Sequence, residues 1–361
     1  MSIAMTPVIN MTNSTQAPYA SHPSALEEFS QKYGRVHGYV AAVICIWGIV
    51  ANIANIVVLT RKNLVSATNT ILTWLAVADL LTMSSYFPVS LHFYIMRAPD
   101  LQFPQTPSIH WSHFMLFHIN FTVLCHTIAI WLTIVLAIFR YLFICYPTMG
   151  MTLCSMYRAK LAILAVYIST AIICIPNYLS TKITSMQSDD NETIYSLDAT
   201  TPLVNRINFW FQAMLIKLIP CGLLTILTIL LIHAMHKANQ RRMKLKSQGK
   251  MNESDRAREH NRTTAMLLAV VGLFLLTELP QGILTLCNTF IADFFERIYW
   301  HLGDLLDIMA LLNNSVNFVL YCSMSSQFRD TFVEIFCGCC PKRPGWLKVK
   351  AVHIKSNGTQ V

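Results

Sequence analysis

Two ionisable side chains stand inside long apolar stretches of the sequence, where a charge is costly. Glu278 lies in the middle of VVGLFLLTELPQGILTL (residues 270–286), and Lys217 lies in another such stretch, three residues before Pro220. A carboxylate at the centre of a bilayer costs a few kcal/mol, and buried charges are normally paired. We therefore predict an internal ion pair between Lys217 and Glu278. Direct ligand contact by Glu278, and a protonated, uncharged Glu278, remain alternatives.

Stripes of mostly polar residues recur at helical spacing in three of the apolar stretches. The three stripes are Asp304, Asp307, Leu311, Asn314, Asn317 and Tyr321, then His118, Thr122, His126, Ala129, Thr133 and Arg140, then Glu278, Gln281 and Thr285. Residues three and four positions apart share one face of a helix. Polar groups that converge inside an apolar wall are typical of a ligand cavity.

The composition indicates a membrane protein rather than a soluble enzyme. Of the 361 residues, 54% are hydrophobic and 12% are charged, whereas soluble domains carry about 25% charged residues. No GxGxxG, P-loop, HExxH or paired CxxC motif occurs, so we expect no enzymatic activity, no cofactor and no structural metal. The net charge of +9 comes from basic residues in short segments between apolar stretches. This distribution indicates membrane orientation rather than binding to nucleic acid.

The eleven cysteines do not suggest a disulfide framework. Almost none lies in a segment that we place outside the cell, so we expect no disulfide. Cys337, Cys339 and Cys340 directly follow a short amphipathic segment, which is typical of palmitoylation. Unmodified thiols are the alternative.

Seven apolar stretches are long enough to cross a bilayer as helices. They lie near residues 38–60, 68–95, 112–144, 158–180, 206–235, 263–290 and 298–323. The predicted fold class is an all-α membrane protein, a seven-transmembrane helix bundle with a short amphipathic eighth helix. We divide the chain into an extracellular glycosylated tail (1–37), the bundle (38–323), the eighth helix (324–336) and a cytoplasmic tail (337–361).

The distribution of lysine and arginine predicts the orientation. Basic residues concentrate after the first stretch, between the fifth and sixth (HKANQRRMKLKSQGKMNESDRAREHNR), and in the C-terminal tail. This places the N-terminus outside and the C-terminus inside, with no cleavable signal peptide. The sequons at Asn10, Asn13 and Asn191 then lie on the side where glycosylation occurs. No internal repeat is visible, which disfavours a transporter built from paired halves, but a transporter remains the alternative class.

Several motifs resemble those of the rhodopsin-like (class A) G-protein-coupled receptors. The matching segments are GIVANIANIVVL with Asn52, LAVADLL with Asp79, IFRYLFICYP with Arg140 and Tyr141, NFVLY with Asn317 and Tyr321, and the helix-breaking Pro220 and Pro280. SSQFRDTF resembles the eighth helix of that family. The chain departs from the family pattern at Phe139, Phe318, Met115, Thr228 and Glu278, which replace an acid, a proline, a cysteine, a tyrosine and a tryptophan.

Within that family, VVLTRKNL, SATNTILTWLAVADLL, TELPQGIL and LLNNSVNFVLYCSMSSQFR resemble the invertebrate myosuppressin receptors. The resemblance implies an amidated neuropeptide ligand that ends in Arg-Phe-amide; a myoinhibitory or sex-peptide-like ligand is the alternative. We expect Asp307 and Asp304 to bind the arginine. Candidates for the phenyl slot are Phe121, Trp111, Tyr94 and Phe211, with Thr122 nearby. Candidates for the amide are Gln281, Gln212 and His126.

The resemblance also implies how such a receptor is activated. Arg140 is expected to meet the G protein when the sixth helix swings outward, with Pro280 as the kink and Phe274 as the pivot. Asp79, Asn52, Asn313 and Asn317 are expected to cluster, with Asp79 as the shared acceptor. A water-filled network there is favoured over a weak sodium site, because Ala129 replaces the usual serine. The implied setting is the plasma membrane, with membrane lipid, a heterotrimeric G protein (Gi/o type), arrestin and receptor kinases as partners.

Overall fold

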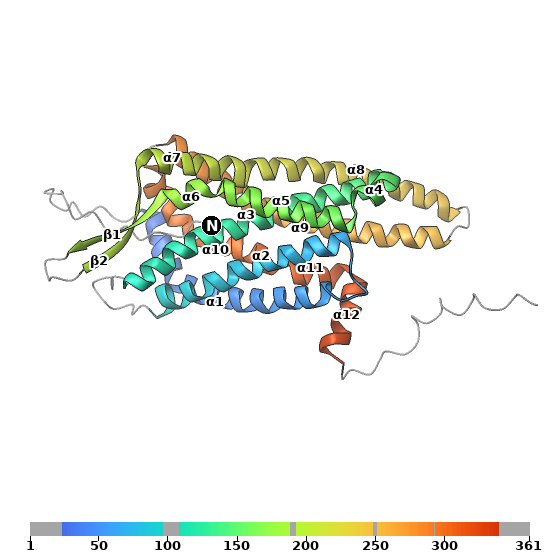
Figure 1. Cartoon of the computed structure of the whole chain (residues 1–361), viewed down its shortest axis with the longest axis horizontal. Helices are drawn as coiled ribbons and strands as arrows, with labels where there is room; N and C mark the ends of the chain where they lie inside the picture. The colour runs from blue at the N-terminus through green and yellow to red at the C-terminus, as the bar shows by residue number, and fades with distance from the viewer. Residues whose placement is uncertain (1–23, 97–107, 188–192, 248–250, 292, 339–361) are drawn as a thin grey trace, which may run out of the picture.

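Long apolar helices run side by side through the molecule (Figure 1). The structure is a computed structural model that describes residues 24–96, 108–187, 193–247, 251–291 and 293–338. Within these residues, seven helices are long and apolar enough to cross a membrane. They are Ala25–Leu59, Ala67–Ile95, Ile109–Cys145, Met156–Ser180, Pro202–Ala234, Val271–Phe290 and Phe295–Ser323. Each overlaps one of the seven spans predicted from the sequence, so the predicted fold class is confirmed.

Some spans are single helices and others join several helical elements. The first, third and sixth are α1 (Ala25–Leu59), α3 (Ile109–Cys145) and part of α9 (Met251–Phe290). The second joins α2 (Ala67–Val89) to η1 (Ser90–Ile95), and the fourth joins α5 (Met156–Ile173) to α6 (Ile175–Ser180). The fifth joins α7 (Pro202–Phe211), η2 (Gln212–Leu218) and α8 (Ile219–Ser247), and the seventh joins η3 (Phe295–Tyr299), α10 (Trp300–Ser315) and α11 (Asn317–Met324). The three η elements are π-helical, a conformation that often marks functional sites.

Three helix ends differ from the sequence-based boundaries. The first helix begins at Ala25 rather than near residue 38, because Ser24 and Glu27 form a capping box at its N-terminus. Helix α8 continues to Ser247 and α9 begins at Met251, so most of the basic segment between the fifth and sixth spans is helical. That segment is rich in Lys and Arg, which favour helix even without an apolar face.

The two ends of the bundle carry different elements (Figure 1). At one end, β1 (Thr181–Gln187) and β2 (Thr193–Ala199) form an antiparallel hairpin in which Thr181 pairs with Ala199. At the other end lie α4 (Pro147–Leu153) and the amphipathic α12 (Ser326–Phe336). We call these the hairpin end and the α12 end. The α12 helix is held to the bundle by a hydrogen bond from Asn63 Nδ2 to Thr331 Oγ1 at 3.0 Å.

The helices pack around a buried interior and leave apolar faces outside. Helix α2 packs against α1 and α3, α1 also against α10, and α8 against both α3 and α9. Large apolar side chains such as Val43, Leu164 and Ile226 are more than half exposed on the outer faces. These faces suit a lipid environment, because lipid tails are as apolar as leucine. Polar side chains are instead collected inside, where they form the site described next.

Candidate ligand and signalling site

Lys217 and Glu278 meet in the interior of the bundle. Lys217 Nζ donates a hydrogen bond to Glu278 Oε2 and another, at 2.9 Å, to Gln281 Oε1. His126 Nε2 lies 3.1 Å from the same Glu278 oxygen and 3.2 Å from Lys217 Nζ. Glu278 is 0% exposed and the other three side chains are also buried. These four residues, from α3, η2 and α9, are called the ion-pair cluster below. In this structure Glu278 is paired with Lys217.

A glycine allows α9 to approach η2 closely at this cluster. A Cβ built on Gly282 would lie 2.9 Å from Lys217 Cβ, whereas non-bonded carbons pack at about 3.5–4.0 Å. Gly282 lies four residues after Glu278 and therefore on the same face of α9. The missing side chain thus lets the two helix backbones come close enough for Lys217 to reach Glu278.

The two carboxylates of the seventh span, Asp304 and Asp307, belong to a second polar group. Tyr86 Oη donates to Asp307 Oδ2 at 3.2 Å, and Tyr94 Oη donates to Asp304 Oδ1 at 2.9 Å. His37 Nε2 lies 3.0 Å from Tyr86 Oη, and its ring centroid lies 4.5 Å from that of Tyr94. His37, Tyr86 and Asp307 are buried, whereas Tyr94 and Asp304 are partly exposed. These five residues, from α1, α2, η1 and α10, are called the tyrosine–carboxylate cluster below.

The predicted ligand contacts therefore divide between two clusters. Asp304, Asp307 and Tyr94 lie in one cluster, and Glu278, Gln281 and His126 lie in the other. Thr122 Oγ1 instead donates to the His118 main-chain oxygen of its own helix, at 2.7 Å.

The other predicted aromatic walls make contacts outside both clusters. Trp111 stacks on His92 with ring centroids 3.7 Å apart. Phe121 stacks on Phe117, which is 53% exposed, and the ring of Phe211 neighbours that of the exposed Trp210.

Gln212, predicted to hold the ligand amide, belongs to a network of amide side chains. Its Nε2 donates to Asn177 Oδ1 at 2.9 Å and to Asn208 Oδ1 at 3.3 Å. Asn177 Nδ2 in turn donates to Asn120 Oδ1 at 2.9 Å. Asn120, Asn177 and Asn208 are buried. The network joins α3, α6, α7 and η2.

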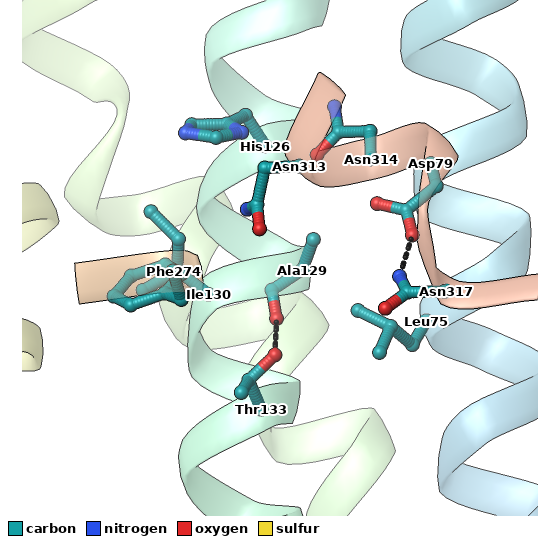
Figure 2. A pocket seen from close by; sticks show the side chains of 10 residues that line it. All are labelled: Leu75, Asp79, His126, Ala129, Ile130, Thr133, Phe274, Asn313, Asn314 and Asn317. Carbon is teal, nitrogen blue, oxygen red and sulfur yellow. Dashed lines mark hydrogen bonds between the residues drawn. The ribbon is translucent and has the colours of Figure 1, made fainter. Parts of the chain in front are cut away.

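A small cavity lies between His126 and the buried carboxylate of Asp79 (Figure 2). Ten residues line it: Leu75, Asp79, His126, Ala129, Ile130, Thr133, Phe274, Asn313, Asn314 and Asn317. Its volume is about 20 Å³, which is room for about one water molecule. His126 thus belongs to both the ion-pair cluster and the wall of the cavity.

The amides around Asp79 have different partners. Asn317 Nδ2 donates to Asp79 Oδ2 at 2.9 Å. Asn52 Nδ2 instead donates to the main-chain oxygens of Gly48 and Asn314, at 2.9 and 3.1 Å. The expectation that Asn52 uses Asp79 as its acceptor is therefore wrong, because the Asn314 main chain takes that place. Asn313 lines the cavity, as Figure 2 shows.

Three of the residues predicted to take part in signalling, Arg140, Tyr141 and Tyr321, lie toward the α12 end. Arg140 is partly exposed near the end of α3. The ring centroid of the next residue, Tyr141, lies 6.4 Å from that of Tyr146. Partial burial raises the pKa of the Cys154 thiol, and the Arg140 guanidinium acts in the opposite direction. Tyr321 is buried against Phe328 of α12, with ring centroids 5.6 Å apart.

Helix α9 carries Pro280 in its interior and the buried Phe274 one and a half turns earlier. Proline cannot donate a main-chain hydrogen bond and commonly kinks a helix. Pro280 lies close to the ion-pair cluster, since Glu278 precedes it by two residues.

Some predicted modification sites lie outside the described residues: Asn10, Asn13, Asn191, Cys339 and Cys340. Cys337 directly follows α12 as a partly exposed thiol, and the nine described cysteines are free. In the part of the chain that the structure describes, no group of three or more His, Cys, Asp or Glu side chains could hold a metal ion.

Sequence reasoning missed several residues of these clusters. His37 stood in the segment assigned to the N-terminal tail, and Tyr86, Asn177 and Asn208 stood singly among apolar neighbours. Two signals were available. The capping residues Ser24 and Glu27 indicate an earlier helix start, and buried amides in a membrane require hydrogen-bond partners.

Seven spanning helices around a buried polar interior are the architecture of a seven-transmembrane receptor. The family described as serpentine type 7TM GPCR chemoreceptor Srw matches residues 39–339, and the chain belongs to this family. It is a G-protein-coupled receptor, a multi-pass protein of the plasma membrane and not an enzyme. The transporter alternative is thereby excluded.

The chain is similar to three named receptors. The G-protein coupled receptor dmsr-1 of Caenorhabditis elegans is 29% identical, covering 84% of this chain and 68% of the relative. The sex peptide receptor of Drosophila melanogaster is also 29% identical, covering 84% and 73%. The FMRFamide receptor of Drosophila melanogaster is 23% identical, covering 83% and 54%.

Proposed function

We propose that this receptor responds to a peptide ending in Arg-Phe-amide, of the myosuppressin/FMRFamide type. The observation that carries the proposal is the pair of carboxylates, Asp304 and Asp307, one helical turn apart in the tyrosine–carboxylate cluster. Similarity to the FMRFamide receptor of Drosophila melanogaster supports the same ligand chemistry.

The chemistry of the cluster fits an arginine side chain. A guanidinium donates two parallel hydrogen bonds to a carboxylate and carries the opposite charge. Asp304 is partly exposed and Asp307 lies one turn deeper, so an arginine would meet Asp304 first. Tyr94 and Trp111 offer aromatic surface for the neighbouring phenyl ring. Gln281 and His126 offer donors and acceptors for the terminal amide.

We propose that the hairpin end faces outward and the α12 end faces the cytoplasm. The basic residues between the fifth and sixth spans and in the tail support this orientation through the positive-inside rule. Arg140 and Tyr141 then face a heterotrimeric G protein, for which the Gi/o type is the first candidate, with arrestin and receptor kinases as further partners. Asn10, Asn13 and Asn191 become glycosylation sites, and Cys337, Cys339 and Cys340 become palmitoylation sites.

The test is a ligand panel applied to cells that display the full chain. The panel contains Arg-Phe-amide peptides, the same peptides as free acids, and the same peptides with the arginine replaced by alanine. Cyclic AMP and calcium are the readouts. We expect responses to the amidated Arg-Phe peptides and weak responses to both altered sets. Silence toward every Arg-Phe-amide peptide, with the receptor detected at the surface, contradicts the proposal.

A second ligand class is favoured by a separate observation. The sex peptide receptor of Drosophila melanogaster shares 29% identity with this chain, compared with 23% for the FMRFamide receptor. Sex-peptide-like and myoinhibitory peptides therefore belong in the same panel. A response to them alone selects this second class.

A further inference from the structure

The Lys217–Glu278 ion pair joins a π-helical segment to an α-helix that contains a proline. Lys217 lies in the π-helical η2, three residues before Pro220, and Glu278 lies two residues before Pro280. Both prolines remove a main-chain hydrogen bond and allow bending there. The ion pair therefore joins the fifth and sixth spans close to both prolines.

The pair is buried deeply enough for its loss to be costly. Glu278 is 0% exposed and Lys217 is 4% exposed. Removing one partner of such a pair leaves an uncompensated buried charge, which strongly destabilises the arrangement. The close approach at Gly282 provides little room for a side chain to fill the gap. The ion pair therefore restrains α9 against η2.

The ion-pair cluster is not fully satisfied. Lys217 Nζ donates to Glu278 Oε2 and Gln281 Oε1 and also lies within hydrogen-bond distance of His126 Nε2. The second carboxylate oxygen, Glu278 Oε1, is buried without a hydrogen-bond partner among the described residues. An unsatisfied buried oxygen costs free energy. An arrangement that gave Glu278 Oε1 a hydrogen bond would remove this cost.

His126 belongs to the ion-pair cluster and also lines the cavity beside the seventh span. Its Nε2 contacts Glu278 and Lys217, and its ring lines the cavity that also contains Asp79, Asn313 and Asn317 (Figure 2). A shift of Glu278 that moves His126 changes the shape of this cavity of about 20 Å³. His126 of the ion-pair cluster and the hydrogen-bonded Asp79 and Asn317 thus line the same small cavity.

We propose that the Lys217–Glu278 pair, with Gln281 and His126, is a latch that holds α9 against η2 and α3 in the resting receptor, and that its opening activates the receptor. Glu278 lies on α9 two residues before Pro280, so opening of the latch frees the segment of α9 that precedes Pro280. This inference rests on the chain being a G-protein-coupled receptor and not on the identity of its peptide.

Two double variants test the latch in membranes that contain the full-length receptor. Lys217→Met with Glu278→Gln removes both charges at once, and Lys217→Glu with Glu278→Lys reverses the pair. Thr277→Val is the matched control, because Thr277 is buried beside Glu278 but bonds only main-chain oxygens of its own helix. No ligand is added, so failure of the proposed peptide class does not affect the result.

Two readouts report latch opening independently. The first is ligand-free nucleotide exchange on a panel of heterotrimeric G proteins, normalised to surface receptor. The second is the alkylation rate of Cys221, measured by peptide mapping after treatment with N-ethylmaleimide. Cys221 is buried one turn after Lys217. The internal reference is Cys45 of α1, which is buried in a core cluster with residues of α2 and α10.

The latch predicts that the uncharged double variant raises both rates at least about fivefold, the lower end of typical coupling between sites. The reversed pair should return both rates toward those of the wild type, while Thr277→Val and Cys45 remain unchanged. An uncharged double variant with wild-type Cys221 alkylation overturns the latch. A reversed pair as reactive at Cys221 as the uncharged variant overturns the role of charge attraction.

A milder variant decides the question if the uncharged double variant does not reach the surface. Gln281→Met keeps both charges and removes one of the three Lys217 contacts. The latch predicts a smaller rise in Cys221 alkylation for this variant, with Cys45 unchanged. No rise at Cys221 overturns the proposal.

Discussion

Asp307 and Glu278 are both buried carboxylates, but their neighbours give them different chemistry. Glu278 has a lysine ammonium and an imidazole within hydrogen-bond distance, and Asp307 accepts a hydrogen bond from the hydroxyl of Tyr86. A buried carboxylate is most stable beside a cation, and Lys217 already provides one for Glu278. Asp304, one helical turn from Asp307, is partly exposed, whereas Glu278 is fully buried. For this reason we propose that the ligand arginine binds at Asp304 and Asp307, and that Glu278 belongs to a structural charge pair.

Asp307→Ala should lower the potency of an Arg-Phe-amide peptide. Truncating one partner of a buried, hydrogen-bonded charge pair costs about 2 kcal/mol or more, which is about a thirtyfold change. Tyr86→Phe is the matched control, because it removes the hydroxyl bonded to Asp307 and keeps the carboxylate. Potency in the cyclic AMP assay, at equal surface expression, is the measurement. Equal potency losses for both variants would mean that the carboxylate charge does not bind the ligand.

At the scale of the elements, buried amides hold the hairpin end of the bundle together. Asn177 at the end of the fourth span accepts from Gln212 and Asn208 and donates to Asn120. The described cysteines are free, so in this part of the chain the joint between the third span and its neighbours is non-covalent. Buried hydrogen bonds of this kind are costly to remove, because each lost partner leaves another amide unsatisfied.

Asn177→Ala should therefore destabilise the helix bundle without changing any charge. Unsatisfied buried polar groups cost about 1–3 kcal/mol, so we expect a lower midpoint of thermal unfolding in detergent. Ser169→Ala is the control on the same span, because Ser169 is exposed and bonds only the Val166 oxygen of its own helix. An Asn177→Ala receptor that unfolds at the wild-type temperature would show that the network contributes little.

Gly282→Ala should loosen the contact between α9 and η2. The added Cβ would lie 2.9 Å from Lys217 Cβ and 3.3 Å from Leu218 Cδ2, so one of the two helices must move. Because alanine favours helix more than glycine does, any loss of stability comes from this clash and not from propensity. We expect a lower unfolding temperature together with raised ligand-free signalling. Gly272→Ala is the control on the same helix, since nothing lies within 4 Å of its added Cβ.

How far the elements and the site follow from the sequence depends on the kind of signal. Spans were predictable because length and apolarity suffice, and the Lys217–Glu278 contact was predictable because two lone buried charges must meet. The ends of α8 and α9 in the basic segment were not predicted, since a polar helix has no periodic apolar residues to mark it. The link between His37, Tyr86 and Asp307 was also missed, because it depends on how three distant helices pack.

At the scale of the whole molecule, the polar clusters follow one another along the interior of the bundle. The tyrosine–carboxylate cluster lies in the first part of the seventh span, near the hairpin end, and the ion-pair cluster lies close to Pro220 and Pro280. Below it are the cavity with Asp79, then Tyr321 against α12. Of these neighbouring groups, the ion-pair cluster and the cavity share a residue, His126. This order has functional meaning only if the hairpin end faces outward.

The orientation predicts which ends and which sequons are reachable from each side of the membrane. An N-terminal epitope tag should bind antibody on intact cells, whereas a C-terminal tag should bind only after permeabilisation. Asn10→Gln with Asn13→Gln should reduce the mass that a glycosidase removes from the protein. Asn252→Gln is the control, because that sequon begins the inner part of α9 and should carry no sugar. A C-terminal tag exposed on intact cells would reverse the bundle and place the tyrosine–carboxylate cluster on the cytoplasmic side, where no secreted peptide could reach it.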